Sequence, residues 1–417
     1  MNPGSFQPAG ADHAEPCSPT SASTSGATGA AGREHRDPCQ LCEATELAEV
    51  EGMARLPRVT SDCKPFRPGG RLAACSVCGG IQAIPDERWR SDVAEIYGAY
   101  EPYHQSGGIE QSVFDATTGA PRRRSALLAT RFAGMLSLGP TGRLLDVGCG
   151  NGAMLSAISE LLPGWSLFGQ DLDDRHLESL ARIPRFADLH TRPLPELTDR
   201  FDVVTMSHSL EHMPAPRAVL AAVRALISPH GRLFVQVPDA QANPFDLVVA
   251  DHLCHFAPLS LSRLVDASGL TVEVTSAEWI AKEISLLARP RSGANGAQDT
   301  TETGTVSPVQ LRERIAWLTA VLGEATQAAS GAMCFALFGT SIAATWLFAS
   351  LGARVAFFVD EDPARVGGRH LGRPVLRPSE VPAGTSVYLA LVPAIAARVR
   401  QRLSGLPVTF HSPPELA

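Results

Sequence analysis

The stretch of the sequence most suited to chemistry is glycine-rich: LLDVGCGNGAMLSAI, from Leu144 to Ile158. Gly148, Gly150 and Gly152 follow a short apolar run and precede a segment with helical spacing. Glycine permits positive φ and has no Cβ, so such a loop can turn sharply and let a ligand approach the backbone closely. The free N–H groups at the start of the helix would then face that ligand.

Two carboxylates beside this loop narrow the class of ligand. Asp146 stands two residues before the first glycine, where its charge would repel a pyrophosphate and favour a cationic ligand bearing an amino group. Asp171, in FGQDLD, closes the next strand-like run roughly 20 residues later, where an acid can accept hydrogen bonds from ribose hydroxyls. The pattern GCGNGA by itself also fits a dinucleotide fingerprint, so a nicotinamide-dependent oxidoreductase is an alternative.

Four cysteines near the start of the chain form two C-x-x-C pairs, Cys39 with Cys42 and Cys75 with Cys78. Two such pairs can supply the four thiolates of a tetrahedral zinc site, and a site filled by protein ligands is structural. Cys63 is a fifth candidate, and a metal-free remnant or a redox pair remains an alternative. Nine cysteines without a recognisable secretory signal favour a reducing compartment, so we expect a cytoplasmic protein.

The elements that must position these residues alternate between apolar strand-like runs and helix-like runs from Arg143 onward. This alternation predicts an α/β fold with a parallel, doubly wound sheet. We expect a disordered tail at 1–36, a zinc-binding module at 37–90, the main domain at 91–288, a linker at 289–308, and a helix with a second Rossmann-like domain at 309–417.

Charge and hydropathy argue against nucleic acid and membrane as partners. The net charge of −7 argues against a nucleic-acid-binding surface, and the basic run at 122–124 is interpreted as a solvated face. The uncharged stretch 334–353 is interpreted as strand, glycine turn and helix rather than a membrane span. The expected partner is therefore a small molecule, while the sequence does not indicate an oligomeric state.

Three segments, LLDVGCGNG, FGQDLD and FDVVTMSHSLEHMPAPRAVL, resemble the class I S-adenosylmethionine (SAM)-dependent methyltransferases, over residues 143–274. The resemblance implies a Rossmann-like domain with a seven-stranded sheet and SAM as the cofactor. The residues that it places around SAM are Asp146, Gly148, Gly150, Gly152, Asp171, Leu172, Asp188, Leu189 and Ser207.

The order of the three parts resembles the zinc-containing sugar C-methyltransferases, which act on nucleotide-linked deoxysugars carrying a keto group. DHLCHF resembles their segment HEHLxxF, so Asp251 takes the position of a family glutamate and His252 that of a histidine proposed as base. The family usually has a tyrosine two residues before that acid, and this chain has Val249. The segment YGAYEPYH resembles the one that supplies an active-site tyrosine, which makes Tyr103 a candidate.

For catalysis we expect His252 to be the general base, with Asp251 orienting or assisting it, and His208 as the second choice. A carbon acceptor beside a ketone needs a base and a donor that stabilises the enolate, whereas a hydroxyl acceptor needs only a base. Each histidine could instead satisfy core hydrogen bonds, and His252, Cys254 and His255 could bind a metal. Glu211 could help to hold SAM or serve as a first-turn helix acid.

The second α/β unit has a weaker ligand loop, with only Gly339 in FGTSIAA and Asp360 at the end of the next strand. We expect it to shape the acceptor site, with a vestigial dinucleotide site as the alternative. The sequence thus favours C-methylation of a nucleotide-linked keto-deoxysugar in sugar biosynthesis. The other possibilities are an O-methyltransferase acting on a glycan or other metabolite and a non-enzymatic protein that binds partners through its zinc module.

Overall fold

The computed structural model describes residues 38–102, 110, 112–114, 121–292 and 307–416. The predicted tail, Tyr103 and most of the predicted linker lie outside the described residues. No described helix is both long and apolar enough to cross a membrane.

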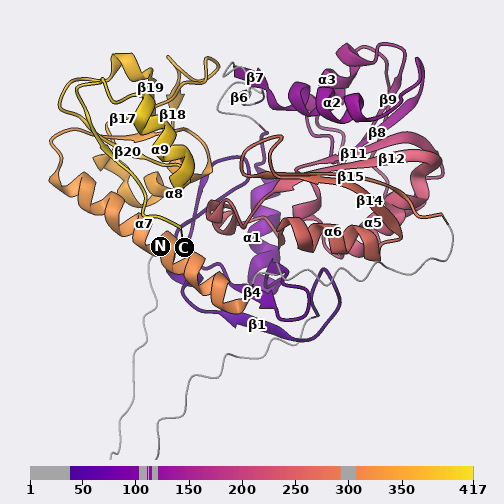
Figure 1. Cartoon of the computed structure of the whole chain (residues 1–417), viewed down its shortest axis with the longest axis horizontal. Helices are drawn as coiled ribbons and strands as arrows, with labels where there is room; N and C mark the ends of the chain where they lie inside the picture. Colours follow the sequence, from indigo (N-terminus) through magenta and orange to yellow (C-terminus); the bar gives the residue numbers. More distant parts are fainter. Residues whose placement is uncertain (1–37, 103–109, 111, 115–120, 293–306, 417) are drawn as a thin grey trace, which may run out of the picture. The chain divides into compact units, whose positions relative to one another are not determined.

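The main part is built on a seven-stranded sheet in the order β10-β9-β8-β11-β12-β15-β14 (Figure 1). Strand β15 runs antiparallel to both of its neighbours, and the strands from β10 to β12 are parallel. The sheet confirms the Rossmann-like fold expected from the alternating pattern. Its strands are β8 (Arg143–Val147), β9 (Ser166–Gln170), β10 (Phe186–His190), β11 (Phe201–Ser207), β12 (Ile227–Pro238), β14 (Leu270–Ser276) and β15 (Glu283–Pro290).

Helices cover both faces of this sheet because successive strand residues point to opposite faces. Leu144 belongs to the apolar cluster that includes the helices α2 and α3, and its neighbour Leu145 to the cluster that includes α5 and α6. Figure 1 shows the two pairs on opposite sides of the sheet. The helical elements are α2 (Arg124–Met135), α3 (Ala153–Leu161), α4 (Leu177–Leu180), η3 (Leu194–Glu196), η4 (Leu210–His212), α5 (Pro216–Leu226), η5 (Pro244–Val248) and α6 (Pro258–Ala267).

The cysteine-containing part holds a four-stranded sheet in the order β1-β4-β5-β13. Its last strand, β13 (Cys254–His255), comes from the middle of the main domain, so residues 37–90 do not complete this sheet by themselves. The other elements before the main sheet are β1 (Leu47–Val50), η1 (Met53–Arg55), β2 (Arg58–Val59), β3 (Pro65–Phe66), β4 (Leu72–Cys75), β5 (Ile81–Ala83), α1 (Glu87–Gly98), β6 (Ser112–Phe114) and β7 (Pro121–Arg123).

The carboxy-terminal part is a second α/β unit with a six-stranded sheet in the order β18-β19-β17-β16-β20-β21. All neighbouring pairs are parallel except β18 with β19. The stretch 334–353 is strand, turn and helix, as predicted. The elements are α7 (Pro308–Gly331), β16 (Phe335–Phe338), α8 (Ile342–Leu351), η6 (Gly352–Arg354), β17 (Phe357–Val359), β18 (Arg369–His370), β19 (Arg373–Leu376), η7 (Pro378–Glu380), β20 (Ser386–Leu389), α9 (Pro393–Arg402) and β21 (Thr409–His411).

Candidate functional site

The three glycines after β8 are required for three different reasons. All have positive φ, at 72° for Gly148, 50° for Gly150 and 86° for Gly152. A Cβ on Gly148 would lie 2.5 Å from the Cβ of Ser209, and one on Gly152 would collide with Leu180 and Ile183. A Cβ on Gly150 would meet no atom within 4 Å, so this glycine borders open space where a ligand can approach the backbone.

Asp171 joins the glycine loop to the end of the next strand. Its Oδ2 accepts a hydrogen bond from the Gly150 amide at 2.7 Å, and its Oδ1 accepts one from the Leu172 amide at 2.7 Å. Both carboxylate oxygens are therefore fixed in position beside the loop. A carboxylate held in this way can accept further hydrogen bonds from a ligand's hydroxyl groups.

Asp146 is buried at the end of β8, where its Oδ1 accepts a hydrogen bond from the Thr205 hydroxyl at 2.7 Å. Burial raises the pKa of Asp146 to about 7, against the opposing effect of that hydrogen bond, and the negative charge of Asp171 adds to the rise. A cation at this site would favour the ionised carboxylate.

A cavity of about 600 Å³ opens from the glycine loop. Its size suits a small-molecule ligand. Its lining includes residues in and beside the glycine loop, Asp146, Gly148, Gly150, Asp171, Leu172 and Ser207, and also Tyr97, Tyr100, His208, Glu211, His212 and His252. The cavity therefore brings together most of the residues that the sequence assigned to cofactor and catalysis.

Among the described residues that the sequence assigned to the cofactor or to catalysis, Gly152, Asp188, Leu189 and Asp251 do not line the cavity. Gly152 instead makes room for two apolar side chains at the start of α3. Asp188 is exposed on β10, where its Oδ1 accepts a hydrogen bond from the amide of Leu189. The fourth is Asp251, which is fully buried behind the cavity.

His252 lines the cavity and is oriented by Asp246, a residue that sequence reasoning did not identify. The Nδ1 of His252 lies 2.8 Å from Asp246 Oδ1, and the Nδ1 of His255 lies 2.6 Å from Asp246 Oδ2. One carboxylate thus accepts an N–H from each ring. This arrangement leaves the other ring nitrogen of His252, Nε2, with the lone pair that a general base requires.

The expectation that Asp251 orients His252 needs correction. The Asp251 carboxylate accepts hydrogen bonds from the amide and hydroxyl of Ser61, at 2.8 and 2.5 Å. Its carbonyl oxygen lies 3.1 Å from Nδ1 of His212, a second histidine on the cavity. Asp251 acts on His252 only through its charge, because its hydrogen-bonding capacity is directed at other residues.

The charge around His252 favours its protonated form. Burial lowers the pKa of this imidazole, but the carboxylate of Asp246, followed by Glu211 and Asp251, outweighs it and raises the pKa to about 9. The free base therefore becomes the main form only above that pH.

His208 is held by charged groups at both ring nitrogens. Its Nδ1 lies 3.2 Å from Glu211 Oε1, and its Nε2 lies 3.2 Å from Glu283 Oε2 and 3.0 Å from an Arg124 nitrogen. Burial and then Arg124 oppose protonation, but the two glutamates outweigh them and hold the pKa of His208 above its usual value. Since neither ring nitrogen is open toward a substrate, His208 is the weaker candidate for a base.

Two further interpretations of the sequence are corrected here. Arg124 does not belong to a solvated basic face, because it starts α2, lines the cavity and pairs with Glu283 at 3.3 Å. Glu211 is a first-turn acid of the short 3₁₀ helix η4 and not of the longer helix α5, and it is almost fully buried. Periodicity could not reveal either position, since both depend on contacts between segments far apart in the sequence.

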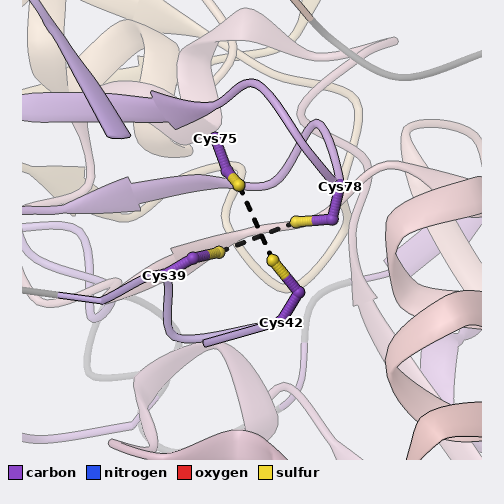
Figure 2. Close-up of side chains that lie close together, drawn as sticks. All are labelled: Cys39, Cys42, Cys75 and Cys78. Carbon is purple, nitrogen blue, oxygen red and sulfur yellow. Dashed lines mark hydrogen bonds between the residues drawn. The ribbon is translucent and has the colours of Figure 1, made fainter. Parts of the chain in front are cut away.

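The four cysteines of the two C-x-x-C pairs converge, and Figure 2 shows their sulfurs pointing toward a common centre. The Sγ atoms of Cys39 and Cys78 are 3.6 Å apart, as are those of Cys42 and Cys75. A zinc ion with tetrahedral bonds of ~2.3 Å places its sulfurs roughly 3.8 Å apart, so the donor set fits such an ion. Cys63 is not part of this cluster and lines the cavity instead.

A metal at DHLCHF, the alternative from the sequence, has partial geometric support. Asp246, His252 and His255 offer ligand atoms within 4.8 Å of one another, but Cys254 is not in that group. The two Nδ1 hydrogen bonds to Asp246 already account for this arrangement without an ion.

The loop of the second α/β unit is filled by the protein's own side chains. Gly339 has φ of 98°, and the neighbouring Thr340 hydroxyl donates to Asp360 at 2.6 Å and accepts from Arg365 at 2.6 Å. Asp360 is thus occupied where a dinucleotide would need it. Arg365 and Ile342 of this unit line the cavity described above, which fits a role in shaping that cavity.

Comparisons with known proteins agree with the glycine-loop geometry. Residues 120–274 match the family model described as a methyltransferase domain. Over 156 residues the chain is 28% identical to a ubiquinone biosynthesis O-methyltransferase of Aeromonas salmonicida, covering 31% of this chain and 63% of that protein. Over 150 residues it is 31% identical to the 27-O-demethylrifamycin SV methyltransferase of Amycolatopsis mediterranei, covering 31% of this chain and 52% of that protein.

The chain therefore spans between half and two thirds of the length of these two curated relatives. Among solved structures, a Burkholderia thailandensis 1,6-didemethyltoxoflavin-N1-methyltransferase is 20% identical with a TM-score of 0.37, covering 54% of this chain and 96% of that one.

Proposed function

We propose that the chain is an enzyme that transfers the methyl group of SAM to a small polar acceptor, and the match of residues 120–274 to a methyltransferase domain supports this proposal. The observation that carries the proposal is the cavity that the glycine loop shares with His252, a histidine whose Nδ1 is bonded to the Asp246 carboxylate. A nicotinamide-dependent oxidoreductase is disfavoured, because Asp146 at the mouth of the loop repels a pyrophosphate.

In this proposal SAM lies along the glycine loop. Its ribose hydroxyls donate hydrogen bonds to the Asp171 carboxylate. The backbone at Gly150 leaves room for its methionine chain, and its ammonium group faces Asp146. Leu172 and Ser207 line the same end of the cavity. Asp188 and Leu189 would reach the adenine only at the outer edge, beyond the residues that line the cavity.

SAM supplies an activated methyl group, so the protein mainly has to orient the acceptor and remove its proton. We assign the removal of the proton to His252 Nε2. As the acceptor atom forms its bond to the methyl carbon, the carbon–sulfur bond breaks and its electron pair stays on sulfur. The proton of the acceptor moves to His252, whose Nδ1–H remains bonded to Asp246.

The acceptor is assigned by class only. The order of the parts and the resemblance of DHLCHF to the segment HEHLxxF support C-methylation of a nucleotide-linked keto-deoxysugar. The two curated relatives reported above support O-methylation, which needs the base but no enolate donor. Arg124, whose guanidinium lines the cavity, could stabilise an enolate oxygen in the first case.

The decisive experiment incubates the purified chain with labelled SAM and a panel of keto and non-keto nucleotide sugars and phenolic metabolites. Product masses would rise by one methyl group, and fragmentation would separate C- from O-methylation. Calorimetric titration with SAM and with NAD runs beside it. Binding of NAD without binding of SAM would refute the proposal.

We also propose that Cys39, Cys42, Cys75 and Cys78 hold a structural zinc ion. The sulfur spacings support this, and four protein ligands leave no position for a substrate. The ion would cross-link the two C-x-x-C segments, which we call the first knuckle (residues 39–42) and the second knuckle (residues 75–78). It would take no part in the methyl transfer itself.

The pKa of Asp146 gives a prediction about cofactor binding. If the ammonium of SAM pairs with ionised Asp146, binding must release the proton that this residue holds below pH about 7. The Kd for SAM should therefore decrease roughly fivefold between pH 6 and pH 7, and the Asp146→Asn variant should lose this change. Calorimetry in buffers of different ionisation enthalpy measures the proton release, and an equal pH dependence in both proteins would contradict the assignment.

A further inference from the structure

The loop that carries His252 is attached on one side to the second cysteine knuckle. Strand β13 pairs with β5, placing Cys254 opposite Gln82 and His255 opposite Ile81. The Ala83 amide adds a hydrogen bond to the Leu253 carbonyl at 2.8 Å. Strand β5 begins only three residues after Cys78, so the backbone leads directly from the thiol cluster to the strand that pairs with β13. We call residues 249–255, which include His252 and β13, the catalytic loop.

Gln82 extends this connection to the first knuckle. Its side chain is only 2% exposed, and its Oε1 accepts a hydrogen bond from the Gln40 amide, between Cys39 and Cys42, at 2.8 Å. One residue thus touches the catalytic strand with its backbone and the opposite knuckle with its side chain. The two knuckles must stay together for both contacts to persist.

The first knuckle also contacts the segment 208–215, which carries His208 and His212 of the cavity. The side-chain oxygen of Gln40 accepts a hydrogen bond from the Ala215 amide at 3.1 Å. Ala215 has φ of 50° and directly follows Met213 and Pro214, which line the cavity. The segment that carries Glu211 is joined to the catalytic loop as well, since the Leu253 amide donates to the Glu211 carbonyl at 2.8 Å.

The opposite side of the catalytic loop is held by the strand β2 and the turn after it. The Ala250 amide donates to the Val59 carbonyl at 2.7 Å, and Asp251 accepts from Ser61. Residues 249–255 therefore lie between two segments of the cysteine-containing part. The main seven-stranded sheet does not pair with β13.

From these contacts we propose that the cysteine cluster helps to position the active site. Gln82 is the residue that connects the state of the cluster to the position of His252. Metal loss frees the two knuckles, loosens β5 from β13 and displaces His252, while the SAM end of the cavity keeps its shape. This inference rests on the proposed function for its kinetic readout. Its structural readout, the exchange of backbone amides, needs no turnover.

The experiment compares the zinc-loaded chain with the same chain after metal removal by a mercurial reagent and a chelator. Elemental analysis is expected to find one zinc ion per chain before treatment and none after it. Hydrogen–deuterium exchange is then expected to accelerate at the amides of Ala83 and Leu253 and to stay unchanged in β8 and β9. The rate of methyl transfer should fall roughly 10- to 100-fold, while the Kd for SAM stays within about twofold.

Gln82→Leu makes the test independent of metal removal, since it keeps the side-chain volume and removes only the acceptor for the Gln40 amide. It should accelerate exchange at the same amides and lower the methyl-transfer rate with zinc still bound. The matched control is Ser76→Ala. Ser76 lies in the second knuckle, but its hydroxyl donates its hydrogen bond to the Glu46 carbonyl. We therefore expect no change in amide exchange at Ala83 and Leu253 in this variant. Unchanged exchange at Ala83 and Leu253 in both the metal-free chain and Gln82→Leu would overturn the inference, whereas coupled exchange without any methylated product would overturn only the proposed function.

Discussion

Replacing His252 with asparagine is expected to lower the rate of methyl transfer by roughly 10²- to 10⁴-fold, the range that a general base contributes. Asparagine can still donate a hydrogen bond to Asp246, but it offers no basic nitrogen to the acceptor. The Kd for SAM should remain within about twofold, because the hydrogen bond of His252 is made to Asp246 and not to a residue of the glycine loop. Single-turnover kinetics and calorimetry measure the two quantities separately.

The pH dependence of the wild-type reaction provides the second readout for His252. Its pKa is raised to about 9, so the base form is the minor species at neutral pH. The value of kcat/KM should therefore rise with pH up to about 9 and level off above it, and His252→Asn should remove this rise. His230→Asn, at an exposed histidine of β12, is the control and should behave as wild type. Full activity in His252→Asn would eliminate the assignment.

Much of the fold could be predicted because it follows from local patterns. The apolar runs that became β8, β9 and β11 are bounded by turn residues, and the helices between them show a regular apolar period. The helix α7 is capped by Ser307, whose hydroxyl accepts a hydrogen bond from the Gln310 amide, and caps of this kind can be recognised in a sequence. The glycine loop is equally local, because positive φ at three alternating positions demands glycine.

The arrangement around His252 could not be predicted in the same way. Asp246 stands six residues before His252 in a 3₁₀ turn with no regular period, and nothing in its type distinguishes it from Asp251. The strand β13 has only two residues, too short to leave a pattern of alternation. Strand β13 is placed by pairing with β5, from a segment more than 160 residues earlier in the chain, and Asp246 contacts His255 of that strand through its side chain. Contacts of that kind are decided by packing, and a single sequence does not record them.

Because Asp246, and not Asp251, orients His252, a substitution of Asp246 should have the other large effect on the rate of methyl transfer. Asp246→Asn should lower the methyl-transfer rate by roughly 10²- to 10⁴-fold, because an amide can present its N–H₂ group to Nδ1. The imidazole would then carry its proton on Nε2, which removes the lone pair that faces the cavity. Losing the carboxylate also removes the main influence that raises the pKa of His252, so any residual kcat/KM should level off well below pH 9.

Asp251→Asn is the matched comparison, since both aspartates are buried and lie close to the same loop. An amide oxygen at Asp251 can still accept the hydrogen bond from the Ser61 amide, so we expect a loss of less than about tenfold. Calorimetry with SAM confirms that each variant is folded around its cofactor end. If Asp251→Asn were the more damaging change and also moved the pH profile, Asp251 would be the orienting residue and the geometry of His252 would have to differ during turnover. Equal methyl-transfer rates in Asp246→Asn and wild type would mean that His252 does not act as the base. An imidazole that already carries its proton on Nε2 cannot accept another one from the acceptor there.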